Sequence, residues 1–264
     1  MANATFNAGI DYFGLETATS NALKVTSSNE NRSKQSTSGA NTYGDAAKVD
    51  SWGETAAPSA EYQIIDTLTQ AGLPDLGTVI AASDSHISID YDGDGTAVAV
   101  PVVLGGFSIS TQNGSAPTAT ASGQTVQSGA TQLRAYELPA FSVSPRHRAQ
   151  DFLGLCTIKI GTSAADDTED YGLESVSAEF PIEFTLAQPK GELKNYDLHG
   201  GMATCSFTMN WYASTAPTVA LSTVATTLGA TMSEPVAKSD PEGGYTQYTW
   251  TVSFPMIGEE HSSS

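Results

Sequence analysis

The segment Thr246-Gln-Tyr-Thr-Trp-Thr-Val-Ser-Phe254 alternates polar and apolar residues without interruption. The same alternation recurs in Ala60-Glu-Tyr-Gln-Ile64, in Ala178 to Leu186, and in Cys205-Ser-Phe-Thr-Met-Asn-Trp211. Side chains on a strand point to opposite faces in turn, so each segment can bury one face and expose the other. The sequence therefore predicts a mainly β fold, an antiparallel β-sandwich or barrel.

Two polar segments divide the chain. Residues 111–132 hold Ser, Thr, Ala, Gly and Gln with neither an aromatic nor a charged residue, which predicts a polar linker or exposed excursion. A first β domain is expected over residues 1–115 and a second over residues 133–264. Ser27 to Tyr43 is almost entirely polar and lacks a period, which predicts a long loop within residues 27–43.

The two predicted domains resemble each other at a constant offset. Tyr62 and Phe207 lie 145 residues apart, and the same offset aligns Leu76 with Leu221 and Val79 with Val224. Residues 73–82 and 217–228 are each expected to form a short helix beside the strands. Two interpretations stay open: two related β domains, each with a flanking helix, or chance similarity among strands rich in Ser, Thr, Ala and Val.

The chain is strongly acidic. Asp and Glu number 29 against 11 Lys and Arg, giving a net charge of −18, which argues against nucleic acid or anionic membrane as a binding partner. No Lys or Arg occurs between Lys48 and Arg134, and this interval is rich in carboxylates. The interval indicates either a solvated acidic face or a surface that repels a polyanion.

The beginning of the chain and its hydropathy bear on location. Met1 to Gly9 has no basic region and no apolar run, so we expect no signal peptide. No run reaches the roughly 20 apolar residues that a membrane helix needs. Cys156 and Cys205 both fall at apolar positions of alternating segments, where we expect reduced thiols in the core, with a disulfide between them as the alternative.

Few residues suggest chemistry. Asp90, Asp92 and Asp94 alternate with Tyr and Gly, which predicts either a hairpin turn or a weak cation site. The EF-hand spacing fails because its twelfth position falls on Pro101. The four histidines have no metal-binding companion, and no nucleophile, base and orienting group come together, so we expect no catalytic residue, no cofactor and no enzyme.

Three tryptophans and two arginines allow other roles. Trp52, Trp211 and Trp250 could line a sugar-binding face, but Trp211 and Trp250 fall on the apolar side of their strands, which favours core packing. Arg146 and Arg148 are expected to pair with an acidic patch of a neighbouring subunit.

The layout of the strands and their following segments resembles phage virion proteins, and among them the tail tube subunits. The resemblance is carried by Ala60 to Ile64 with Leu76 to Ile80, by Cys205 to Tyr212 with Pro217 to Leu228, and by Tyr245 to Phe254. It implies a β-sandwich or barrel with a flanking helix and a long polymerising loop. In that family the subunits stack as rings around a lumen through which DNA passes, and some duplicated members form trimeric rings with six-fold pseudo-symmetry.

The resemblance also implies partners and a location. The expected partners are further copies of the chain, other virion proteins, and passing DNA that is not bound specifically, with no membrane; the location is the virion, after synthesis and assembly in the host cytoplasm. Two alternatives stay open: a capsid decoration or other head protein, and a cation-dependent carbohydrate-binding module or adhesin that uses Asp90 to Asp94 and Trp52. The candidate assembly or lumen residues are Asp50, Glu54, Glu61, Asp66, Arg146 and Arg148.

Overall fold

One large antiparallel sheet organises the computed structural model. The model describes residues 13, 15, 22–40, 46–90, 93–126, 134–145, 154–160, 163–164, 172–186, 196–211, 216–240, 242–256 and 258–260. Along the described part of the sheet the order is β1 (Leu23–Ala40), β2 (Ala46–Ile64), β8 (Thr118–Thr125), β7 (Val102–Gln112), β13 (Leu173–Leu186), β15 (Met202–Trp211), β19 (Tyr245–Pro255) and β17 (Thr231–Met232). Three more strands join it: β4 (Val79–Ile80) on β7, β14 (Tyr196–Gly200) on β13, and β18 (Val236–Asp240) on β19. The prediction of a mainly β, antiparallel fold is confirmed.

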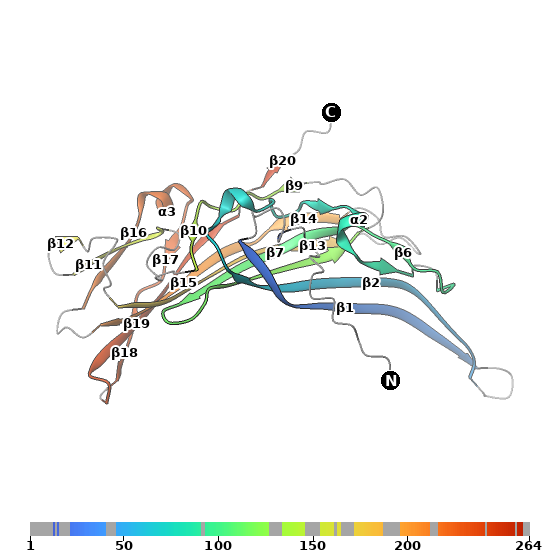
Figure 1. Cartoon of the computed structure of the whole chain (residues 1–264), viewed down its shortest axis with the longest axis horizontal. Helices are drawn as coiled ribbons and strands as arrows, with labels where there is room; N and C mark the ends of the chain where they lie inside the picture. Colours follow the sequence, from blue (N-terminus) through green and yellow to red (C-terminus); the bar gives the residue numbers. More distant parts are fainter. Residues whose placement is uncertain are drawn as a thin grey trace.

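Short elements gather on one side of this sheet, the upper side in Figure 1. They include the 3-10 helix η1 (Gln70–Gly72) and the helices α2 (Ala82–Ser85) and α3 (Thr223–Thr227). Four small sheets accompany them: β3 (Leu68–Thr69) with β10 (Ser142–Val143), β5 (Ser88–Ile89) with β6 (Val98–Ala99), β9 (Arg134–Ala135) with β20 (Glu259–Glu260), and β11 (Cys156–Ile160) with β12 (Ser163–Ala164) and β16 (Thr218–Leu221). The hydrophobic core lies between these elements and the main sheet.

The main sheet repeats one strand order. In the first half the order is β1-β2-β8-β7, and in the second it is β13-β15-β19-β18, with every neighbouring pair antiparallel. Tyr62 and Phe207, which the predicted offset aligns, lie in the second strand of each order, β2 and β15, opposite Val25 and Val176. The two halves join directly through β7 and β13, from Gly106 opposite Pro181 to Gln112 opposite Ser175. The two units that share this strand order therefore form one continuous sheet.

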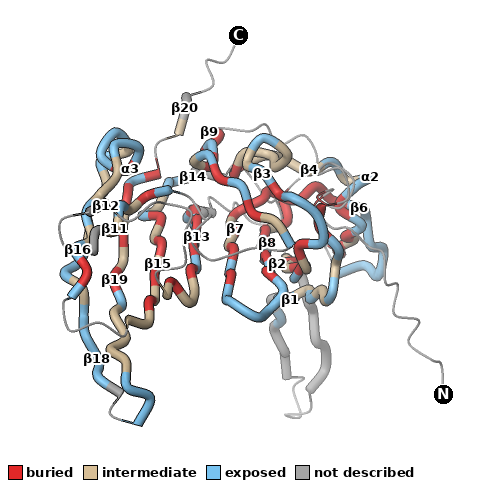
Figure 2. Tube along the Cα trace, turned by 60° about the vertical axis from the view of Figure 1, so that its left-hand side comes forward, coloured by how far each residue is buried: buried red, intermediate tan, exposed pale blue. Residues whose placement is uncertain are grey.

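The alternation of the sequence sets which face is buried. In β15 the side chains of Ala203, Cys205, Phe207 and Met209 are buried, and the intervening side chains are not. Phe207 stacks on Trp250 of β19, with ring centroids 5.5 Å apart and the rings 7° from parallel. Figure 2 shows buried and less buried positions following one another along the strands. The core-packing interpretation of Trp250 is confirmed, whereas Trp211 at the end of β15 is only half-buried.

The predicted loop at Ser27 to Tyr43 is wrong in its described part. Residues 27–40 belong to β1, which pairs with β2 from Leu23 opposite Ile64 to Ala40 opposite Ala46. The hairpin extends beyond the core, so most described side chains on β1 are exposed or half-exposed and no apolar period marks the strand. Figure 1 shows this hairpin projecting at one end of the sheet, while the hairpin of β18 and β19 projects at the other.

The predicted linker over residues 111–132 is also wrong where it is described. Residues 118–125 form β8, a central strand that pairs with β2 on one side and β7 on the other. Ala119, Ala121 and Gly123 occupy its buried face, so a strand with little apolar surface still fits between larger neighbours. The first unit therefore extends past residue 115 to Thr125.

The helix predictions are partly correct. Each unit has a short helix, but residues 73–82 contain β4 and only the first residue of α2, and residues 217–228 contain β16 before α3. Ser222 caps α3, because its hydroxyl oxygen accepts a hydrogen bond from the Ala225 N–H. The helices are therefore not related by the offset of the strands. No helix in the described ranges has the length and hydropathy to span a bilayer.

Candidate assembly surfaces

The face of the main sheet that turns away from the core is lined by small polar side chains. In the second unit it carries Thr204, Ser206 and Thr208 of β15 beside Thr249, Thr251 and Ser253 of β19. In the first unit it carries Ser108 and Ser110 of β7 beside Thr118, Thr120 and Ser122 of β8. We call this surface the open face, since the short elements of the described chain lie on the other side.

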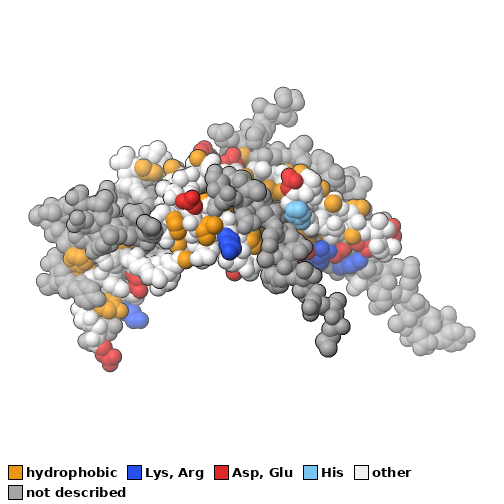
Figure 3. Space-filling model, viewed as in Figure 1, with side chains coloured by type: hydrophobic (Ala, Val, Ile, Leu, Met, Phe, Trp, Pro, Cys, Tyr) orange, Lys and Arg blue, Asp and Glu red, His pale blue; other side chains and the backbone are white. Residues whose placement is uncertain are grey.

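The open face is free of basic residues across its central strands. Residues 56–64 of β2 and all of β7, β8, β13, β15 and β19 contain no Lys or Arg, whereas they contain Glu61, Glu174, Glu179 and Glu183. Lys24 of β1 and Lys238 of β18 lie on the outermost strands. Figure 3, in the orientation of Figure 1, shows Lys and Arg side chains at a few separate places among mostly uncharged side chains. The central open face therefore offers hydroxyls and carboxylates, a combination that does not attract a polyanion.

A small hydrogen-bond network orders one end of this face. Glu174 Oε2 accepts hydrogen bonds from Asn210 Nδ2 at 2.8 Å and from Gln247 Nε2 at 3.3 Å. Gln247 Nε2 also lies 3.3 Å from Asn210 Oδ1. The network links β13, β15 and β19, so it holds side chains of three strands in a defined arrangement.

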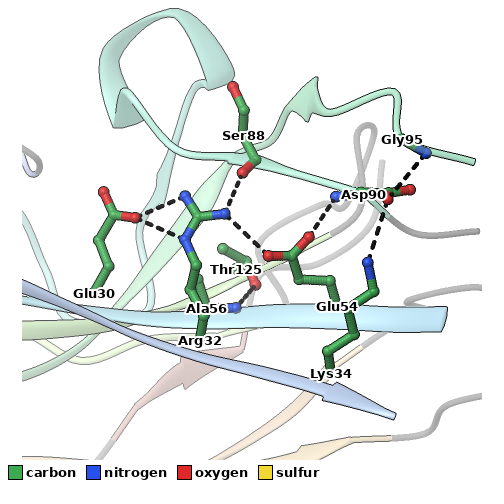
Figure 4. Close-up of polar contacts among 9 residues, drawn as sticks. All are labelled: Glu30, Arg32, Lys34, Glu54, Ala56, Ser88, Asp90, Gly95 and Thr125. Carbon is green, nitrogen blue, oxygen red and sulfur yellow. Dashed lines mark hydrogen bonds and ion pairs between the residues drawn. The ribbon is translucent and has the colours of Figure 1, made fainter. Parts of the chain in front are cut away.

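A charged cluster lies at the base of the β1-β2 hairpin, on the covered side of the sheet (Figure 4). Arg32 donates to Glu30 Oε2 from Nη2 at 2.7 Å and from Nε at 3.0 Å, and its Nη1 donates to Glu54 Oε1 at 3.1 Å and to the Ser88 carbonyl oxygen at 2.9 Å. Lys34 Nζ lies 3.3 Å from Asp90 Oδ2. These contacts tie both strands of the hairpin to β5 and the turn after it. We call Glu30, Arg32, Lys34, Glu54 and Asp90 the hairpin clamp.

The clamp lowers the pKa of both carboxylates that face the turn. For Glu54 the main cause is the hydrogen bond from the Asp90 N–H at 2.9 Å, with further lowering by Arg32. For Asp90, desolvation acts to raise the pKa, but the N–H groups of Gly93 and Gly95 and the Lys34 ammonium together outweigh it. The Arg32 pKa is raised, chiefly by its hydrogen bond to Glu30. All three groups are therefore charged near neutral pH.

The Asp-Gly segment forms the predicted hairpin turn. Ser88 lies opposite Ala99 and Ile89 opposite Val98, so β5 and β6 flank the turn as expected. Asp92 lies outside the described residues, while Asp90 accepts two backbone N–H groups and Asp94 accepts that of Thr96. Among the described residues no group of three or more His, Cys, Asp or Glu side chains is arranged to hold a metal. The contacts of Asp90 are those of a turn that is stabilised by its own side chain.

The predicted assembly or lumen residues are separated in space. Glu61 lies exposed on the open face and accepts a hydrogen bond from Ser27 Oγ at 2.8 Å. Glu54 lies instead in the hairpin clamp, on the covered side. Asp66 is exposed just after β2, where its side chain accepts the Thr67 N–H at 2.7 Å. The side chains of Asp50 and Trp52, together with Arg146 and Arg148, lie outside what the structure describes.

Sequence reasoning missed the clamp residues on β1. Glu30, Arg32 and Lys34 alternate with Asn31 and Ser33, which is the period of a strand that carries charge on one face. Interpreting residues 27–43 as a loop concealed that signal.

Comparison of the sequence with protein-family models and with curated proteins gave no match.

Proposed function

We propose that this chain is a structural subunit of a phage particle, most specifically a tail tube protein whose copies form stacked rings around a DNA conduit. The observation that carries the proposal is the open face, a broad sheet surface of hydroxyls and carboxylates whose central strands hold no Lys or Arg.

A conduit for DNA must avoid holding its cargo. Duplex DNA carries one negative charge per about 1.7 Å of its axis, and each phosphate that a Lys or Arg neutralises adds affinity through counterion release. Such a lining holds Glu61, Glu174, Glu179 and Glu183 on the central strands, and on β1 and β18 it holds only Lys24 and Lys238, so it adds few such contacts. Passing DNA is therefore confined without being bound specifically.

The β1-β2 hairpin supplies a second feature of such a subunit. It projects from one end of the sheet, and the hairpin clamp fixes its base against β5. We assign it to the contact between stacked rings, because it reaches beyond the hydrophobic core of its own chain.

A shortened hairpin tests the stacking role. Residues 36–51 are replaced by an Asn-Gly turn, which keeps Gln35 opposite Trp52 and leaves Arg32, Lys34 and Glu54 in place. We expect a folded chain with an unchanged unfolding temperature that forms single rings or short stacks. Full-length tubes from this variant in electron micrographs would contradict the role.

Negative-stain microscopy of the purified chain tests the proposal as a whole. We expect hollow tubes or rings. Isolated particles that stay monomeric at high concentration would overturn it, and binding to preformed capsids without tubes would favour a decoration protein instead.

A further inference from the structure

We infer that β18 of one copy pairs antiparallel with β1 of the next copy, with Val236 opposite Ser27, and that this contact closes the ring. The inference rests on the proposed function and deepens it, since it names the surface through which neighbouring copies join. The partner is a second copy of this chain.

The joint between the two units of the chain is the template. Within the chain, β7 is the last strand of the first repeated order and pairs with β13, the first strand of the second. The counterpart of β7 is β18, and the counterpart of β13 is β1. In the described chain β18 pairs with β19 alone and β1 with β2 alone. The two outer edges therefore match the two strands that already join inside the chain.

The register on the β18 side follows from cross-strand pairs. Ser110 of β7 lies opposite Thr118, which lies opposite Gln63. The offset of 145 residues aligns Gln63 of β2 with Thr208 of β15. Thr208 lies opposite Thr249 of β19, and Thr249 lies opposite Val236 of β18. Val236 is therefore the counterpart of Ser110.

The same procedure places Ser27 on the β1 side. Ser177 of β13 lies opposite Ser206 of β15, and the offset aligns Ser206 with Glu61 of β2. Glu61 lies opposite Ser27 of β1, so Ser27 is the counterpart of Ser177. Ser110 lies opposite Ser177 at the internal joint. Val236 of one copy is thus placed opposite Ser27 of the next.

The β18 edge carries an exposed apolar side chain. Val236 is 66% exposed, the largest value among the exposed large hydrophobic residues of the described chain. An uncovered edge strand of this kind is a site of pairing with another chain. Pairing with β1 would cover Val236 and satisfy the backbone groups of both edges.

The contact is heterologous, because β1 and β18 are different surfaces, and repetition of a heterologous contact gives a ring when the rotation closes. At about 4.8 Å per strand, the eight strands of one copy's repeated orders span about 38 Å across the sheet. Three copies would then enclose a backbone circle about 37 Å across, before strand tilt widens it. The repeat would give such a ring twice as many sheet units as chains.

Cysteine pairs test the register directly. The Asn113 N–H donates to the Glu174 carbonyl oxygen at 2.8 Å, so Asn113 and Glu174 form a hydrogen-bonded pair. Hydrogen-bonded and non-hydrogen-bonded pairs alternate along antiparallel strands, and Ser110 lies three residues before Asn113, so Ser110 and Ser177 form a non-hydrogen-bonded pair. Such pairs have Cα atoms about 4.5 Å apart, within the range that a disulfide accepts. The matching experiment mixes S27C chains with V236C chains under mild oxidation and follows dimers on a non-reducing gel.

We expect dimers from the mixture and from neither variant alone, and a ladder of higher oligomers from the double variant. The matched control replaces V236C by A237C, whose side chain points to the other face of the strand, and should lower the dimer yield at least fivefold. The unsubstituted chain should not cross-link, because Cys156 and Cys205 are unbonded and partly or fully buried.

Each outcome decides something. Dimers from V236C alone would overturn the inference in favour of a two-fold edge contact, and equal yields with A237C would overturn the register. Tubes in micrographs without cross-links would overturn the inference while supporting the proposed function. Cross-links without tubes would support the inference and overturn the proposed tail tube function.

Discussion

Replacement of Glu54 by Ala should release the base of the β1-β2 hairpin. Glu54 Oε2 accepts the N–H of Asp90 at 2.9 Å in a part-buried hydrogen bond, and Asp90 is 8% exposed, so the variant leaves this donor without its acceptor. An unsatisfied buried donor costs about 1–3 kcal/mol. The ion pair with Arg32 adds less, because the Arg32 side chain is 41% exposed and screened pairs contribute at most about 1 kcal/mol.

A loss of about 2 kcal/mol corresponds to about a 30-fold increase in local opening. Hydrogen exchange followed by mass spectrometry measures this opening in peptides that cover residues 28–34 and 86–90. Peptides from β15 should keep their protection, because Glu54 contacts the hairpin base and the turn after β5.

The matched control is Glu61→Ala on the same strand. Glu61 is exposed and accepts side-chain hydrogen bonding from Ser27 Oγ at 2.8 Å, so its loss should change exchange by no more than about twofold. Two results would refute the clamp as the anchor of the hairpin. One is equal exchange rates in the two variants, and the other is an exchange rate in Glu54→Ala less than threefold above that of the parent chain.

Three further outcomes follow from the same contacts. The pKa values of Glu54 and Asp90 are lowered in the folded chain. The two ionised carboxylates therefore stabilise the fold above their ordinary pKa values near 4, and this stabilisation is lost as the pH falls through their pKa values in the folded chain. The difference in unfolding temperature between the parent chain and Glu54→Ala should therefore shrink between pH 7 and pH 3. In a denaturation assay, Gly123→Ala should lower the free energy of unfolding by about 1–3 kcal/mol, because the new Cβ would lie 2.7 Å from Val102 Cγ1 and 2.9 Å from Phe13 Cε1. The control Ser122→Ala, at an exposed position, should change it by less than about 0.5 kcal/mol. Burial raises the pKa of Cys156 to about 11 and that of Cys205 well above its usual value, so a thiol reagent at pH 8 should label both cysteines in denaturant but label the native chain slowly; rapid labelling of the native chain would contradict their burial.

The strands with large apolar residues could be predicted from the sequence, and those with small or polar residues could not. Phe207 and Trp250 stand in segments whose alternation is unmistakable, and both bury their side chains. In β8 the buried positions are filled by Ala119, Ala121 and Gly123, because larger neighbours already occupy the space above them. Hydrogen bonds from both adjacent strands fix this segment in the sheet, and no single-sequence property records them.

The candidate surface was predictable in part for a similar reason. Glu54 and Glu61 belong to one acidic interval, yet they lie seven residues apart on β2, and an odd separation on a strand points two side chains to opposite faces. Glu61 therefore reaches the open face and Glu54 reaches the clamp. The period of charge at Glu30, Arg32 and Lys34 could have identified the strand. Its partners Ser88 of β5 and Asp90 in the turn after β5, however, are each 56 residues away in the sequence.

Electron cryomicroscopy of the assembled chain tests the central claim most directly. The proposal predicts a hollow tube whose wall is a continuous sheet, with the β18 strand of each subunit hydrogen-bonded to β1 of its neighbour and the open face lining the lumen. Failure to form any ring or tube, or a tube in which the short covering elements line the lumen, would contradict it.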